Sequence, residues 1–158
     1  MRLTMSTLKR AVLPAVVAAS AVLLLPSRAA QPDQPDPKIL IYTPPDKIPW
    51  KKGAASDTAN LVGDPNKEGL YVLLIKWHPH NMSRPHTHPT ARYITVLSGT
   101  WWIGTGPHWD PNDTYPAPAG SYIVDKPNEI HWDGAKDADC VLEIVGMGPA
   151  TTTPAKEQ

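Results

Sequence analysis

Phenylalanine is absent from this 158-residue sequence, and cysteine occurs only once, at position 140. A single cysteine cannot close a disulfide within the chain, so stability has to come from packing or from a bound metal. Neither sign of charge is in excess, because 15 basic side chains balance 15 acidic ones, and this argues against a nucleic-acid partner. The 19 prolines and 10 glycines favour short strands between rigid turns over long helices.

Residues 1–29 have the order of a signal peptide. Basic residues precede an apolar run over 11–25, which is short for a membrane span, and small residues follow it. We expect cleavage after Ala29, with Ala30 as the alternative, and hence a periplasmic or secreted protein with no membrane segment after cleavage. An uncleaved N-terminal anchor is the other interpretation. The Pro-rich stretch 30–37 is then an extended leader.

The rest of the chain predicts one all-β domain over 38–148, followed by a flexible tail at 149–158. Its apolar runs are short, rich in β-branched or aromatic residues, and bounded by Gly, Pro, Asn or Asp. We expect strands at 39–42, 70–77, 92–97, 100–104, 121–124 and 141–145. Short strands without helical periodicity indicate a barrel or a sandwich. Trp101 and Trp102 alternate along one strand, so one of them packs inside while the other faces away.

The stretch RPHTHPTARYITVLSG places His86 and His88 two residues apart at the start of an expected strand. Residues two apart in a strand project from the same face, so both imidazoles can reach one ion. Neutral imidazole suits Zn, Fe, Mn, Ni or Cu, and each of these needs a further ligand from elsewhere in the chain. Two solvated histidines in a Pro-rich loop are the alternative that the spacing alone leaves open.

Two spaced motifs resemble those of the cupin superfamily. The first motif runs glycine, five residues, His-x-His, three or four residues, glutamate, six residues and glycine. The second runs glycine, five residues, Pro-x-Gly, two residues, histidine, three residues and asparagine. The sequence keeps both spacings, with His86, His88, Gly99, Gly120 and His131 matching, and with His80, Arg92, Lys126, Asn128 and Ala135 departing.

The resemblance implies a single-domain double-stranded β-helix, which is a jelly-roll barrel. It also implies that His86, His88 and His131 meet inside the barrel as ligands of one divalent transition metal, either Fe, Mn, Zn, Ni or Cu. Cupins of this type include metal-dependent dioxygenases and lyases that act on small molecules. The alternatives are a non-catalytic cupin that binds or senses a small ligand, and a structural cupin with a degenerate site. Cupins also commonly form homodimers by pairing edge strands.

Arg92 stands where the cupin motif has a glutamate ligand. Counting by twos from His88 places it on the inward face, where a guanidinium cannot ligate metal. A unit charge about 5 Å from a divalent cation repels it by roughly 6 to 7 kcal/mol at an effective dielectric near 20, so an anion has to intervene. Glu143 is one candidate and a substrate carboxylate is the other, which makes Arg92 and Glu143 the candidate catalytic residues and an anionic small molecule the expected ligand. The alternative is an arginine whose head reaches the barrel rim.

Overall fold

The computed structural model describes residues 35–156, and the regular structure of this part is almost entirely β. Its only helix is a single 3₁₀ turn, η1 (Pro45–Lys47), so no helix there is long and apolar enough to cross a membrane. The strands are β1 (Ser56–Val62), β2 (Gly69–Trp77), β3 (Asn81–Met82), β4 (His86–Thr87), β5 (Arg92–Ser98), β6 (Thr100–Thr105), β7 (Tyr115–Pro118), β8 (Tyr122–Asp125), β9 (His131–Ala135), β10 (Cys140–Gly148) and β11 (Thr153–Pro154). The all-β expectation is confirmed.

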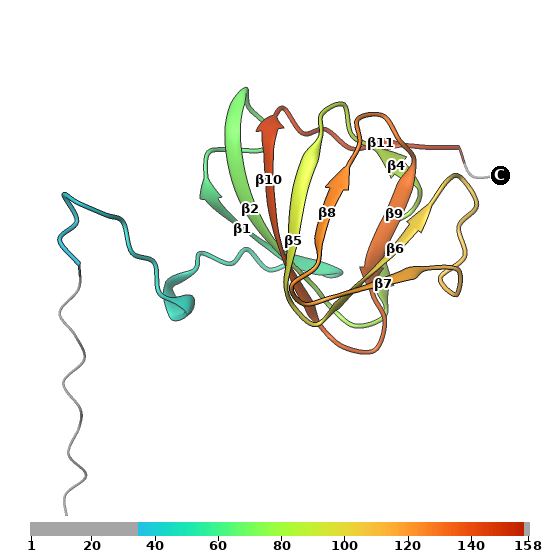
Figure 1. The fold of residues 1–158 in the computed structure, drawn as a ribbon, viewed down its shortest axis with the longest axis horizontal. Coiled ribbons are helices and arrows are strands. Elements are labelled where there is room, and N and C mark those ends of the chain that lie inside the picture. The colour runs from blue at the N-terminus through green and yellow to red at the C-terminus, as the bar shows by residue number, and fades with distance from the viewer. Residues whose placement is uncertain (1–34, 157–158) are drawn as a thin grey trace, which may run out of the picture. The chain divides into compact units, whose positions relative to one another are not determined.

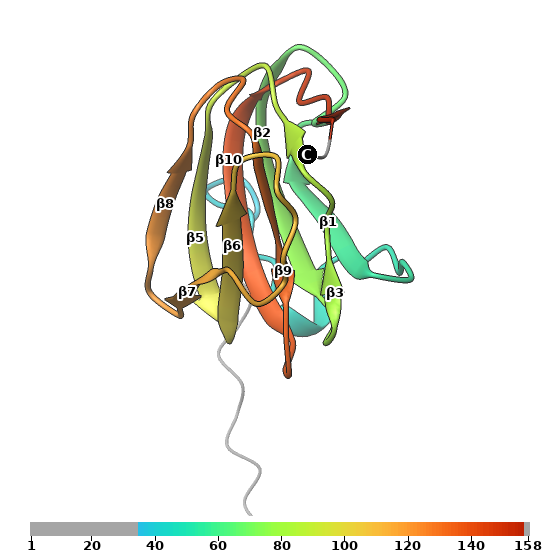
Figure 2. The same cartoon turned by 90° about the vertical axis from the view of Figure 1, so that its right-hand side faces the viewer.

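Two antiparallel sheets enclose the core (Figures 1 and 2). Sheet A has the strand order β1-β2-β10-β5-β8, and sheet B has the order β11-β4-β9-β6-β7, with β3 also paired to β9. Buried side chains from both sheets form one cluster, which includes Tyr71, Ile94 and Leu142 from sheet A and Trp101 and Ala135 from sheet B. The space between the sheets is therefore where side chains from distant parts of the sequence meet.

The strand expected at 39–42 is wrong. The amides of Ile39 and Leu40 both donate to the carbonyl of Asp36, at 2.9 and 3.2 Å, so this segment begins in a turn. Ile39 and Ile41 are 80% and 92% exposed, and an apolar run without a neighbouring strand has no ladder to join. The six expected strands also leave out β1, β7, β9 and β11. Of these, β11 lies in the segment expected to be a flexible tail, and it pairs with β4.

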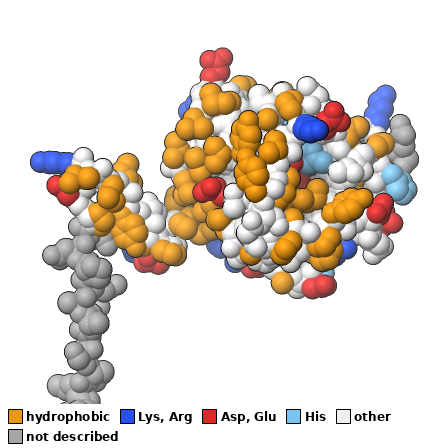
Figure 3. Space-filling view, in the orientation of Figure 1, with side chains coloured by type: hydrophobic (Ala, Val, Ile, Leu, Met, Phe, Trp, Pro, Cys, Tyr) orange, Lys and Arg blue, Asp and Glu red, His pale blue; other side chains and the backbone are white. Residues whose placement is uncertain are grey.

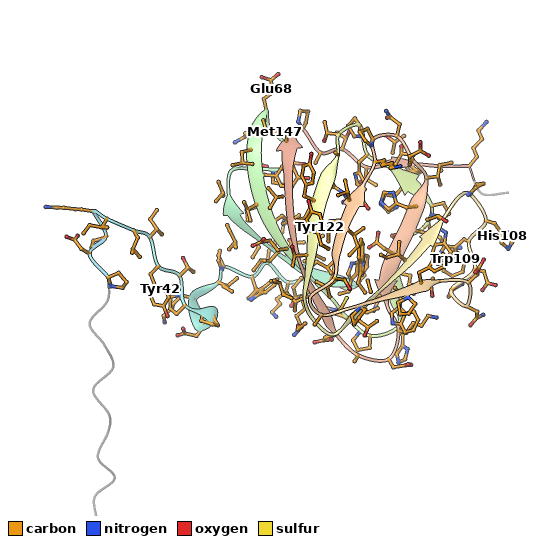
Figure 4. The ribbon with its side chains drawn as sticks, in the orientation of Figure 1. Tyr42, Glu68, His108, Trp109, Tyr122 and Met147 are labelled. Carbon is orange, nitrogen blue, oxygen red and sulfur yellow. The ribbon has the colours of Figure 1, made fainter. Side chains whose placement is uncertain are left out.

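Side chains of sheet A alternate between the core and an apolar outer face. On β10, Leu142 and Ile144 are buried in the core, and the residues between them point outward. Figure 3 shows hydrophobic side chains gathered over this outer face, and Figure 4 labels Tyr122 and Met147 on it. The exposed apolar residues of β2, β5, β8 and β10 are Leu70, Tyr93, Leu97, Tyr122, Val124 and Met147. The same alternation places Glu143 on the outer face.

The four positions where the cupin motifs have glycine all have left-handed backbone. Gly99 and Gly120 have φ values of 73° and 89°, and His80 and Asn128 have φ values of 61° and 63°. Histidine and asparagine are among the few L-residues that tolerate this region. Backbone hydrogen bonds hold the turns at His80 and Asn128. The amide of His80 donates to the carbonyl of Lys136 at 2.6 Å, and the amide of Asn128 donates to the carbonyl of His88 at 2.7 Å. The two departures from glycine therefore keep the turns that place the histidines.

Candidate metal centre

His86 and His131 face each other across two neighbouring strands of sheet B. They are register partners, since β4 pairs with β9 at this one position. Each ring is held by the backbone two residues before it. Nδ1 of His86 donates to the carbonyl of Arg84 at 2.7 Å, and Nδ1 of His131 donates to the carbonyl of Glu129 at 3.1 Å. A carbonyl accepts only, so Nδ1 carries the proton in both rings and Nε2 keeps its lone pair.

His88 lies just after β4, and a segment distant in sequence orients its ring. Its Nδ1 donates to the carbonyl of Thr151 at 3.0 Å, in the stretch that leads into β11. Its Nε2 is buried and has no hydrogen-bond partner within the part of the chain that the structure describes. A buried lone pair without a donor is costly in a protein interior unless a ligand or an ion uses it.

The three rings converge on one point. Their centroids lie 4.5 to 5.3 Å apart, and one ring nitrogen from each residue lies within 4.8 Å of the others. Burial lowers the pKa of His88 to about 4 and also lowers the pKa of His86, so both rings are neutral near pH 7. Three buried imidazoles whose Nδ1 atoms donate to carbonyls are the donor set that a divalent transition metal requires. The residues present fit the implied ion.

Arg92 does lie on the inward face of β5, and its partner there is Asp125. The two are register neighbours on β5 and β8. Both Nε, at 2.9 Å, and Nη2 of Arg92 donate to Oδ2 of Asp125, and Nη2 also lies 3.2 Å from Nε2 of His131. Glu143 lies on the opposite face of β10 from Leu142 and Ile144, so it is not the carboxylate next to Arg92. The anion that the sequence requires beside Arg92 therefore comes from β8.

A cavity of about 350 Å³ extends from His86 and His88 between the two sheets. Most of its lining is apolar, with Ile75 and Trp77 from β2 and Leu142 and Ile144 from β10. Its polar lining residues are Ser83, Arg84, His86, His88, Arg92, Asp133 and Thr152. A small molecule with an apolar body and a polar or charged end fits this distribution.

Two residues of the site were not predicted, for different reasons. Asp125 ends the strand YIVD, where alternation from Ile123 places it on the inward face beside Arg92, so the sequence contained a signal for it. Thr151 contributes only a backbone carbonyl, 63 positions after His88, and no side-chain pattern indicates that contact. His78 and His108 lie outside the centre: the ring of His78 bonds Ala54 and Asp57, and His108 is exposed in the β6–β7 loop (Figure 4).

The ChrR cupin-like domain family matches residues 39–150. The chain belongs to this family. The cupin resemblance found in the two motifs is therefore confirmed over most of the sequence, and the two-sheet architecture is the double-stranded β-helix that it implies. No curated protein matches this cupin.

Solved structures similar to this cupin share its fold and differ in function. The polyketide cyclase RemF from Streptomyces resistomycificus has a TM-score of 0.61 at 15% identity, over 75% of this chain and 87% of that one. The DMSP lyase DddQ from Ruegeria pomeroyi has a TM-score of 0.55 at 13% identity, over 68% and 61%. A sugar phosphate isomerase of the cupin superfamily from Silicibacter pomeroyi has a TM-score of 0.56 at 16% identity, over 71% and 78%. At these identities the likeness establishes the fold alone.

Proposed function

We propose that this chain is an exported cupin that binds one divalent transition metal through His86, His88 and His131 and acts as a dioxygenase or lyase on a small anionic molecule. The observation that carries the proposal is the convergence of three buried rings whose Nδ1 atoms are all held by backbone carbonyls. Export rests on the order of residues 1–29, which lie outside the described residues. The intact mass of the mature protein tests it, and a mass that retains Met1 contradicts cleavage.

The chain's own groups orient the ligands and shape the space beside them. Three carbonyls fix the imidazoles, and the apolar walls of the cavity keep water away from a bound substrate. An ion bound here supplies Lewis-acid or oxygen-binding chemistry. Three neutral ligands leave its positive charge uncompensated, and Nη1 of Arg92 makes no hydrogen bond among the described residues. Both features favour an anionic group on the ligand.

The fold does not choose the reaction, since a cyclase, a lyase and an isomerase are among the similar structures. A non-catalytic cupin that binds or senses a small anion is the second candidate. The Arg92–Asp125 pair favours it, because Arg92 stands where the cupin motif has a fourth ligand and Asp125 holds it there. Oxygen uptake by the metal-loaded protein with small acids and phenols separates the two, since turnover supports the enzyme and binding without turnover supports the sensor.

Metal analysis of purified variants tests the centre itself. Single His→Ala changes at 86, 88 and 131 should each remove most of the bound metal, because each deletes one of three ligands. His78→Ala and His108→Ala are matched controls that should retain it, since neither ring belongs to the cluster. Equal loss of metal from all five variants contradicts the assignment.

A further inference from the structure

Among the described residues, His131 is the only one of the three metal-ligand candidates whose Nε2 accepts a hydrogen bond. The donor is Nη2 of Arg92, at 3.2 Å. Because Nδ1 of His131 donates to Glu129, the lone pair that Arg92 uses is the same one that a metal ion needs. A guanidinium and a metal ion cannot share it.

Asp125 holds the guanidinium in this position. Its Oδ2 accepts from both Nε and Nη2 of Arg92, and the two side chains are only 11% and 6% exposed. The same Oδ2 lies 3.5 Å from Nε2 of His131, so two hydrogen-bond acceptors face each other with Arg92 donating to both. Little water reaches this contact to compete with the pair.

We propose that the Arg92–Asp125 pair is a latch on the metal centre, with the guanidinium occupying the lone pair of His131 until an ion displaces it. This inference rests on the proposed metal site and concerns how that site is regulated. Binding of an ion requires Arg92 to release His131 while Asp125 retains it. The latch lowers the affinity for every divalent ion and slows its entry, so only ions that bind imidazole strongly load the site.

The two members of the latch have opposite effects on metal affinity. Removing the guanidinium frees His131 and removes a positive charge from beside the ion. Removing the charge of Asp125 leaves Arg92 uncompensated next to a dication, which weakens binding. If the pair had a purely structural role, removing either member would destabilise the fold, and both variants would bind metal more weakly.

The test measures Zn²⁺ affinity by competition with a chromogenic chelator and Co²⁺ entry by stopped-flow absorbance. The proteins are the wild type, Arg92→Met, Asp125→Asn and the double variant. Arg92→Met should bind Zn²⁺ about ten- to a hundredfold more tightly, the factor expected for one hydrogen bond to a charged group, and should take up Co²⁺ faster. Asp125→Asn should bind more weakly than the wild type. The double variant should bind more tightly than Asp125→Asn but less tightly than Arg92→Met, because it lacks both the guanidinium and the carboxylate charge that lies 3.5 Å from Nε2 of His131.

Lys76→Met and Asp139→Asn are the matched controls, because they break an ion pair of 2.8 Å that does not line the cavity. Both should stay within about twofold of the wild type, since at that site only screened, long-range charge changes. If Arg92→Met fails to fold by circular dichroism, Arg92→Gln takes its place and must change the affinity in the same direction.

The outcomes separate the latch from the metal site. A wild type that binds Zn²⁺ together with an Arg92→Met variant that binds it no more tightly overturns the latch and leaves the proposed site standing. A wild type without measurable binding beside a variant that binds supports both. If neither protein binds Zn²⁺ or Co²⁺, the proposed site fails and the latch fails with it.

Discussion

Replacing Trp101 by phenylalanine tests whether the buried end of the cavity depends on one hydrogen bond. The indole of Trp101 is 1% exposed, and its Nε1 donates to Oδ1 of Asp133 at 3.0 Å. Asp133 is itself only 5% exposed, so little water is in reach to replace the lost donor. A buried hydrogen bond to a charged group is worth about 1.5 to 3 kcal/mol, and the smaller ring adds a packing loss. We expect the free energy of unfolding to fall by about 2 to 4 kcal/mol.

The assay is guanidinium denaturation followed by far-UV circular dichroism, because the variants differ in tryptophan fluorescence. Trp102→Phe is the matched control on the same strand, since the Trp102 ring stacks with Nζ of Lys136 at 4.0 Å. A partly exposed cation–π contact is worth about 1 kcal/mol or less, so this control should lose little. Equal losses in the two variants would refute the reasoning, because a partly exposed ring without this hydrogen bond would then cost as much as the buried ring that makes it.

Three further changes have signs fixed by the geometry. Burial lowers the pKa of His88 to about 4 and also lowers the pKa of His86, whereas the same histidines in the unfolded chain protonate near 6.5. The free energy of unfolding should therefore be largest above pH 6.5 and fall as the pH approaches 4. Denaturation at several pH values checks this, and a flat profile contradicts it. In Gly104→Ala, the new Cβ would lie 2.0 Å from the Trp132 ring, so calorimetry should show a loss of about 1 to 3 kcal/mol that Trp132→Leu partly restores in the double variant. His80→Gly should instead stabilise the protein by up to about 1 kcal/mol, because φ is 61° there, and a destabilised variant would mean that the histidine side chain makes a compensating contact.

The parts of the fold that the sequence predicted are those where side chains alone determine the structure. The strands at 70–77, 92–97, 100–104 and 141–145 are apolar and β-branched, and the structure contains β2, β5, β6 and β10 there. The strand SDTANLV of β1 is polar and carries little β propensity, and it forms because β2 offers it a partner. Pairing with a neighbour is a tertiary effect that a single strand's composition does not reveal.

The candidate site divides in the same way. Motif spacing was enough to select His86, His88 and His131 from six histidines, because the fold converts fixed spacing into convergence. The inward direction of Arg92 also followed from counting by twos. Its partner did not, since Glu143 and Asp125 both lie on strands next to β5 and only their faces distinguish them. The contact of Arg92 with His131 depends on side-chain rotamers, which no sequence pattern fixes.

The bond from His88 to the Thr151 carbonyl gives the order of synthesis a part in building the site. All three histidines and every strand of sheet A are translated before residue 151, so a chain interrupted after β10 has both sheets available for pairing except for β11. In that chain His88 has no acceptor for Nδ1, and its ring can turn or adopt the other tautomer. Proteolytic trimming back to residue 150 would leave the same unfinished ligand. Metal loading would then distinguish intact molecules from shortened ones that keep the folded β-structure.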